Sequence, residues 1–244
     1  TFGRHVSSRN SEVIHSGLYY KPGSLKAKLC VEGNRLLYDF ARKYNINHIH
    51  CKKIIVIPTS KELPRLEALM QNGENNGVEG LRIISGEEVS QREPIIKAAG
   101  GLSAPSTGII DSHEYMHKLE YLIRSSESSI VYNTEVNGIN YKENYYTLSL
   151  KNMDYQAKSK IVINSAGLWC DEVAKMAGIN DYTLNICKGE YYKTSMYRNA
   201  LNTLIYPLPT EISLGIHIVI HLDGTIGFGP NAYYVDNIDY SMDD

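Results

Sequence analysis

The first stretch with chemically useful side chains is SSRNSEVIHSGLYY, residues 7–20. Hydrogen-bond donors crowd its beginning: Ser7, Ser8, Arg9, Asn10 and Ser11. His15 follows a few residues later. A loop so rich in donors is suited to a polyanion such as a pyrophosphate. A solvated surface loop has the same composition, so the residues alone leave both interpretations open.

Two histidines stand four residues apart in LGIHIVIHLDGT. Alternation predicts a strand here, with His217 and His221 on one face, and Asp223-Gly224 predicts a hairpin turn after it. At about 3.3 Å per residue the two imidazoles lie roughly 13 Å apart, too far to share a metal ion. We therefore expect no metal site. His217 alone is either a structural histidine or a catalytic one.

A third candidate is a strand, a turn of small residues and a helix. Ile161–Ile163 is apolar on both faces, which predicts a strand in a covered parallel sheet. Ser165-Ala166-Gly167 then leads into a helix over Cys170–Ala177. Such a turn lets backbone N–H groups approach a phosphate closely, although many turns between a strand and a helix use glycine. The sequence contains no Gly-x-Gly-x-x-Gly, P-loop, kinase or serine-hydrolase signature.

Helices and strands are expected throughout the chain. A long helix should follow the N-cap Ser24, with Leu25, Leu29, Leu36 and Phe40 as its apolar stripe. A buried strand at Ile54–Ile57 is ended by Pro58, and short helices are expected at 62–70 and after the cap Ser85. Asp111, with Glu114 three residues later, resembles a capping arrangement. The buried face of that helix would be Tyr115, Met116, Leu119, Leu122 and Ile123.

These elements predict a mixed α/β fold with two interleaved units, one of βα type and one with an antiparallel sheet. The chain has 244 residues, 43% of them hydrophobic, and a net charge of −2. A charge so close to zero argues against nucleic acid as the partner. No apolar run is long enough to span a membrane and no signal region is recognisable, so we expect a cytoplasmic protein, with attachment to the inner membrane left open.

Segments along the whole chain resemble the L-2-hydroxyglutarate oxidase/dehydrogenase family, which belongs to the D-amino-acid-oxidase-like superfamily. The resemblance is carried by the opening 44 residues and by APSTGIIDSHEYM, TEVNGI, VINSAGLWCDEVAKMAG, KGEYYK, LIYPLP, LGIHIVIHLDGTIGFGPNA and DYSMD. It implies a Rossmann-like FAD-binding domain interleaved with an antiparallel-sheet substrate domain. Residues 1–47 and 109–180 would belong to the first, and residues 48–108 and 181–244 to the second.

The resemblance also implies roles for individual residues. Those near FAD would be Ser7, Ser8, Asn10, Ser11, His15, Glu135, Val136, Ala166, Gly167 and Leu168. Those near the substrate would be Arg9, Tyr20, Lys188, Tyr191 and His217. His217 would be the base or a carboxylate partner, and His15, beside the flavin, is the second catalytic candidate. At Lys188 the family leads us to expect arginine, whose two-pronged hydrogen bonding a lysine lacks.

The implied reaction is hydride transfer from a 2-hydroxy acid to FAD, giving a 2-oxo acid, with oxygen or a quinone as electron acceptor. In the family a Gly-x-Gly-x-x-Gly strand would precede Thr1 and a glycine-rich segment would follow Asp244, so complementing N- and C-terminal segments are expected. Two alternatives stay open at this point. One is an inactive or split-gene fragment that does not bind FAD alone. The other is a related flavin oxidase acting on an amino acid or glycerol phosphate.

Overall fold

The structure is a computed structural model that describes residues 1–210 and 214–242. As predicted, it is a mixed α/β fold, and it divides into two compact units that are interleaved in sequence. Unit 1 contains residues 1–9, 119–187 and the stretch from Tyr234; unit 2 contains residues 10–118 and 188–233. The sequence-based prediction assigns some segments to an FAD-binding domain and others to a substrate domain. The two compact units carry no such roles by themselves, so this assignment stays a prediction. The end of its last segment, 181–244, includes residues outside the described part of the chain.

Unit 2 is built on a mixed seven-stranded sheet with the order β11-β14-β13-β12-β3-β5-β4. Its strands are β3 Lys53–Ile57, β4 Arg82–Ser85, β5 Gly100–Ala104, β11 Tyr192–Thr194, β12 Leu204–Tyr206, β13 His217–Ile220 and β14 Ile226–Gly229. β12 runs parallel to β3, and the other pairings are antiparallel. The turn between β13 and β14 is the predicted one, because the Asp223 carboxylate accepts a hydrogen bond from the Thr225 N–H (2.9 Å).

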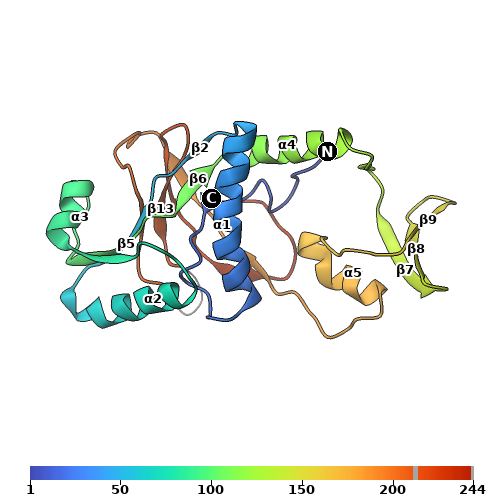
Figure 1. Ribbon diagram of the computed structural model, residues 1–244, viewed down its shortest axis with the longest axis horizontal. Coiled ribbons are helices and arrows are strands. Elements are labelled where there is room, and N and C mark those ends of the chain that lie inside the picture. Colours follow the sequence, from blue (N-terminus) through green and yellow to red (C-terminus); the bar gives the residue numbers. More distant parts are fainter. Residues whose placement is uncertain (211–213, 243–244) are drawn as a thin grey trace. The chain divides into compact units, whose positions relative to one another are not determined.

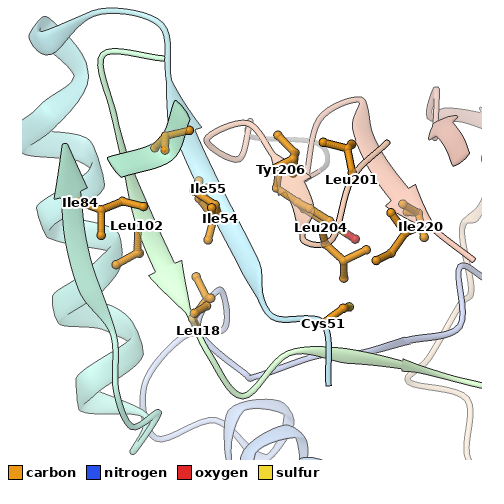
Figure 2. Packing of buried hydrophobic residues seen from close by; sticks show 14 of the residues in the cluster. Leu18, Cys51, Ile54, Ile55, Ile84, Leu102, Leu201, Leu204, Tyr206 and Ile220 are labelled. Atoms are coloured by element: carbon orange, nitrogen blue, oxygen red, sulfur yellow. The ribbon is translucent and has the colours of Figure 1, made fainter. Parts of the chain in front are cut away.

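The core of unit 2 surrounds β3, whose predicted apolar run is confirmed. Ile54, Ile55 and Ile57 are at most 1% exposed. Figure 2 shows Ile54 and Ile55 beside Leu102 from β5 and Leu204 from β12. Helices α2 (Leu63–Asn75), after the short 3-10 turn η1 (Ser60–Glu62), and α3 (Gly86–Arg92) lie against β5 (Figure 1). Apolar burial on both faces of β3 explains its almost uninterrupted isoleucine-valine sequence.

Helix α1 (Leu25–Tyr44) begins where predicted, but the face that it buries is opposite to the predicted one. The Ser24 hydroxyl accepts a hydrogen bond from the Ala27 N–H (3.2 Å), which confirms the N-cap. The predicted stripe is wrong: Leu25, Leu29 and Leu36 are 69%, 55% and 48% exposed. The buried face carries Ala27, Tyr38 and Ala41. At 100° per residue these two sets lie on opposite sides of the helix, and the small alanine side chains allow the closer packing.

A small sheet with the order β1-β6-β2 supports α1. Its strands are β1 Val13–Ile14, β2 His48–Ile49 and β6 Gly108–Ile110. Gly108 allows a close approach here, because a Cβ on it would collide with the Tyr38 hydroxyl and would lie 2.5 Å from the Ile49 carbonyl oxygen. Ile14, Ile46 and Ile110 pack with the buried face of α1 in a second, smaller core.

Helix α4 (Ser112–Arg124) begins at the predicted cap. The Asp111 carboxylate accepts a hydrogen bond from the Glu114 N–H (2.8 Å). Glu114 itself accepts from the backbone and side-chain amides of Asn47, both at 2.8 Å, instead of closing a capping box. Its predicted apolar face is only partly covered: none of its residues is fully buried, and Ile123 is 38% exposed.

Unit 1 contains an antiparallel sheet of β7 (Val136–Lys142), β8 (Tyr145–Leu150) and β9 (Gln156–Ser159). It is followed by the 3-10 turn η2 (Gly167–Trp169) and the predicted helix α5 (Cys170–Met176). Strands β10 (Ile186–Lys188) and β15 (Tyr233–Val235) pair with each other where the chain changes units.

The strand predicted at Ile161–Ile163 is absent from the described structure. These residues belong to no sheet, and Ile161 and Ile163 are 73% and 81% exposed. A strand exists only where a neighbouring strand accepts its hydrogen bonds, and no described segment pairs with this one. Within residues 1–210 and 214–242, no helix has the length and apolar character needed to cross a membrane.

Candidate active site

Three adjacent strands of unit 2 present Lys53, Tyr206 and His217 on one face of the sheet. Leu204 of β12 lies beside Lys53 of β3, and Ile205 lies opposite Ile218 of β13, so Tyr206 and His217 are neighbours. The Tyr206 ring stacks on the His217 imidazole with centroids 3.8 Å apart and planes 15° apart. The Lys53 ammonium lies 4.5 Å from the centroid of the same tyrosine ring. All three side chains are buried.

Hydrogen bonds on both ring nitrogens fix the orientation of His217. Its Nδ1 lies 2.8 Å from the Gly215 carbonyl oxygen, which can only accept, so Nδ1 carries the proton. Its Nε2 lies 3.0 Å from the Tyr191 hydroxyl, which therefore donates to it. Tyr191 is also hydrogen-bonded to the side chain of Ser11. Ser11 and Tyr191, both predicted site residues, are thus joined to His217 in one chain of hydrogen bonds.

Burial keeps His217 neutral. Loss of hydration lowers its pKa to about 4, against the opposing effect of the bond to the Gly215 carbonyl, and the nearby Lys53 charge lowers it further. At neutral pH the imidazole is therefore unprotonated.

The segment carrying His15 and Tyr19 belongs to the same site. It is held by asparagine amides: Asn34 donates to the His15 carbonyl oxygen (3.0 Å), and Asn72 donates to the Leu18 carbonyl oxygen (2.7 Å). The centroid of the Tyr19 ring lies 4.6 Å from the Lys53 ammonium, about as close as that of Tyr206. Two tyrosine rings therefore contact this lysine.

His15 offers a nitrogen that the protein leaves unused. Within the described part of the chain, its buried Nδ1 has no hydrogen-bond partner. Burial, followed by the charges of Lys53 and His217, lowers its pKa to about 3, so this imidazole is also neutral at pH 7. A neutral imidazole with a free ring nitrogen can take a proton from a bound hydroxyl.

The other predicted substrate residues lie apart from this cluster or are already paired. Lys188 forms an ion pair with Glu190 (3.4 Å), and both side chains are about nine-tenths buried. Tyr20 hydrogen-bonds to Cys30 and lies under the Lys26 ammonium, 4.7 Å from its ring centroid.

Predicted FAD residues of unit 1 gather at a pocket of about 630 Å³. Glu135, Val136 and Ala166 line it, together with apolar side chains such as Ile139 and Trp169. The mainly apolar lining can accept an aromatic group such as adenine. Gly167 and Leu168 begin η2 directly after it, and Gly167 has a left-handed φ of +59°.

The remaining predicted residues of the opening loop have partners within the protein. Ser8 donates to the His5 carbonyl oxygen (3.2 Å), and the Asn10 side chain accepts from the Glu12 N–H (2.8 Å). Ser7 takes part in an interaction of its own. The Arg9 guanidinium covers the Tyr240 ring at 4.1 Å from its centroid. None of these four contacts identifies a ligand, so the roles implied for these residues stay predictions.

Comparison with known proteins identifies the family. The model of the FAD dependent oxidoreductase family matches residues 1–244. The chain belongs to this family. FAD is the cofactor of this family.

Sequence relatives include the mitochondrial L-2-hydroxyglutarate dehydrogenase of Mus musculus, 36% identical over 93% of this chain and 52% of that protein. The L-2-hydroxyglutarate dehydrogenase of Escherichia coli K12 is 35% identical over 93% of this chain and 54% of that protein. The chain thus spans about half the length of the curated relatives it matches.

Solved structures agree on the fold. The FAD-bound L-alpha-glycerophosphate oxidase of Mycoplasma pneumoniae has a TM-score of 0.88 and 27% identity, covering 96% of this chain and 63% of that one. The glycine oxidase of Geobacillus kaustophilus has a TM-score of 0.82, covers 99% of this chain and 65% of that one, and at 18% identity shows the fold alone.

Lys53, Tyr19 and Tyr206 are not among the site residues predicted from the sequence. The predicted strand covers Ile54–Ile57, whereas β3 begins at Lys53. The signal was present, because strand alternation places Lys53 on the same face as Ile55 and Ile57, both of which are buried.

Proposed function

We propose that the chain provides the substrate-oxidising site of an FAD-dependent enzyme that converts L-2-hydroxyglutarate, or a closely similar 2-hydroxy acid, to the 2-oxo acid. Two L-2-hydroxyglutarate dehydrogenases among the relatives support this substrate. The observation that carries the proposal is the neutral, buried His15, with an unused Nδ1 among the described residues, beside a buried lysine.

Oxidation of a secondary alcohol removes a proton from oxygen and a hydride from carbon. His15 is the proton acceptor in this proposal, since its imidazole is neutral at pH 7 and its Nδ1 has no partner among the described residues. FAD, when bound, supplies the hydride acceptor. The positive charge that develops on His15 would form close to Lys53, so the proton must be passed on before the next turnover.

His217 acts as a positioning residue in the same proposal. Both of its nitrogens are engaged, with Gly215 and with Tyr191, so it has no free proton to donate to a carboxylate. It holds the Tyr191 hydroxyl toward the site, and Ser11 holds the other side of that hydroxyl.

The unit 1 pocket of Glu135, Val136 and Ala166 would hold the adenine end of FAD. The family resemblance assigns the opening loop to the flavin end. An apolar pocket with a tryptophan in its wall favours stacking of an aromatic base.

Glycerol 3-phosphate is the second candidate substrate. The FAD-bound L-alpha-glycerophosphate oxidase superposes with a TM-score of 0.88. Glycerol 3-phosphate is also an anionic secondary alcohol, which a buried cation and a neutral imidazole could accept by the same proton transfer.

A substrate panel tests the proposal. The FAD-loaded protein is assayed with L-2-hydroxyglutarate, D-2-hydroxyglutarate and glycerol 3-phosphate, with oxygen and with a quinone analogue as acceptors. We expect turnover of L-2-hydroxyglutarate alone, lost by about 10²-fold or more in His15→Asn. His113→Asn, on the exposed side of α4, is the control and should keep full activity. Turnover of glycerol 3-phosphate alone would show that glycerol 3-phosphate, and not L-2-hydroxyglutarate, is the substrate. A His15→Asn variant that stays active would show that His15 is not the base.

A further inference from the structure

We propose that Lys53 is the binding site for a carboxylate of the substrate and restricts the site to dicarboxylates such as 2-hydroxyglutarate. The inference rests on the proposed function and adds a substrate class and the residue that selects it.

Lys53 is fully buried and has no acidic partner among the described residues. Its side chain is 0% exposed, and Nζ has no hydrogen-bond partner within residues 1–210 and 214–242. No carboxylate of residues 1–210 and 214–242 forms an ion pair with it, and burial raises the pKa of the nearby Cys30 and Cys51 thiols, so both are neutral at pH 7. Lysines are almost never fully buried unless they are paired. An anion from outside the described protein is therefore the expected partner.

Lys188 is also buried, but unlike Lys53 it has an acidic partner in the described part of the chain. Both lysines are buried next to tyrosine rings, yet Lys188 has Glu190 at 3.4 Å and its charge is already balanced. Lys53 is the lysine whose charge is left for a ligand.

The side chains around Lys53 can donate hydrogen bonds to an anion. The ring centroids of Tyr19 and Tyr206 lie 4.6 and 4.5 Å from the ammonium, and such contacts attract the charge without neutralising it. The hydroxyls of both tyrosines, and Nδ1 of His15, also lack partners among the described residues. Burial raises the pKa of both phenols, so they remain hydrogen-bond donors at neutral pH. One cation and two neutral donors favour a ligand with carboxylate oxygens.

Lys53 lies close enough to His15 for its charge to act on the imidazole, and this closeness agrees with the proposed reaction. A base at His15 acts on the hydroxyl of C2, so a cation close to it can hold a carboxylate of the same molecule. Burial lowers the pKa of Lys53 to about 7, so a bound carboxylate would draw a proton onto the amine.

The test is binding of glutarate, a dicarboxylate without a hydroxyl, compared with butyrate. Isothermal titration on the FAD-loaded wild type should give clear glutarate binding and much weaker butyrate binding. Lys53→Met should weaken glutarate binding about 30-fold or more, since removal of one partner of a buried charge pair costs at least about 2 kcal/mol. Lys52→Met, at the exposed neighbour, is the matched control and should bind glutarate like the wild type.

A second measurement is of proton uptake. At pH 8, titrations of the wild type in two buffers of different ionisation enthalpy should reveal uptake of about one proton per glutarate bound. Proton uptake in the wild type that is absent from Lys53→Met would support the inference. A Lys53→Met protein that binds glutarate normally and loses only FAD would overturn it.

The outcomes separate this inference from the proposed function. If 2-hydroxyglutarate is not oxidised but glutarate binds through Lys53, the proposed function fails and the dicarboxylate site stands. If 2-hydroxyglutarate is oxidised and Lys53→Met changes neither its KM nor glutarate affinity, the dicarboxylate site fails alone.

Discussion

The ring of Tyr206 lies flat against the imidazole of His217, with centroids 3.8 Å apart and an angle of 15° between the planes. The two side chains project from adjacent antiparallel strands, and the other neighbour of Tyr206 is the buried ammonium of Lys53. One aromatic ring therefore separates a neutral imidazole from an amine in the interior of unit 2. This arrangement makes the site sensitive to substitutions that leave the sheet itself intact.

Tyr206→Phe should leave the fold as stable as the wild type or stabilise it by up to about 1 kcal/mol. The hydroxyl of Tyr206 is buried and has no partner in the described structure, and removing an unsatisfied polar group is neutral or favourable. Urea unfolding of both proteins measures the difference. A loss of more than about 1 kcal/mol would mean that the hydroxyl is hydrogen-bonded in solution.

Tyr191→Phe should lower the free energy of unfolding by about 1 kcal/mol, because the bond to His217 Nε2 is lost. The donated bond favours the neutral imidazole, so its loss should also raise the pKa of His217. Nitrogen-15 NMR of the imidazole measures this pKa directly. An unchanged pKa together with unchanged stability would show that the 3.0 Å contact contributes little.

Stability should fall on acidification below pH 6.5. The pKa values of His217 and His15 are lowered from 6.5 to about 4 and about 3, so between these limits the unfolded chain binds more protons. The contribution is fully present above pH 6.5 and is lost as the pH falls toward 4 and 3, with a slope of about 1.4 kcal/mol per pH unit for each group.

The same linkage applies to Lys53 in the alkaline range. Its pKa is lowered from 10.5 to about 7, so stability should rise with pH between 7 and 10.5. Unfolding curves from pH 4 to 10 for the wild type, His217→Gln and Lys53→Met separate these groups. His217→Gln should flatten the curve below pH 6.5. Lys53→Met should flatten it above pH 7 and should also reduce the fall below pH 6.5, because the Lys53 charge contributes to the lowered pKa values of His15 and His217. A variant curve parallel to that of the wild type would reject the lowered pKa concerned.

Helix α1 offers a test of which face is buried. Leu29→Gln should change the free energy of unfolding by less than about 0.5 kcal/mol, since Leu29 is 55% exposed. Ala41→Leu should cost about 1–3 kcal/mol, because Ala41 is 0% exposed and an added isobutyl group overpacks that face. Thermal unfolding compares the two, and the reverse order of effects would contradict the observed packing.

Local signals predicted most of the helices and strands. Ser24, Asp111 and the Asp223-Gly224 turn each act through hydrogen bonds within a few residues, so sequence spacing is enough to find them. The face of α1 and the state of Ile161–Ile163 depend on which segments lie next to them. Periodicity reports that a face is apolar and says nothing of what covers it, which is why both predictions failed.

In the candidate site, too, local patterns predict some residues, while others come together only through contacts between distant segments. His15 and His217 were found from the sequence, one by family resemblance and one by its strand. Their closeness to Lys53 depends on the parallel pairing of β12 with β3, a contact about 150 residues apart in sequence. Tyr19 and Tyr206 contribute because of that pairing, and no local pattern distinguishes them from the other tyrosines.

The most direct test of the account is the flavin absorbance of the FAD-loaded protein without oxygen. On addition of L-2-hydroxyglutarate the visible band should bleach, and D-2-hydroxyglutarate should leave it unchanged. In His15→Asn the bleaching by the L-isomer should slow by about 10²-fold or more. A band that dithionite bleaches and L-2-hydroxyglutarate does not would contradict the proposed reaction.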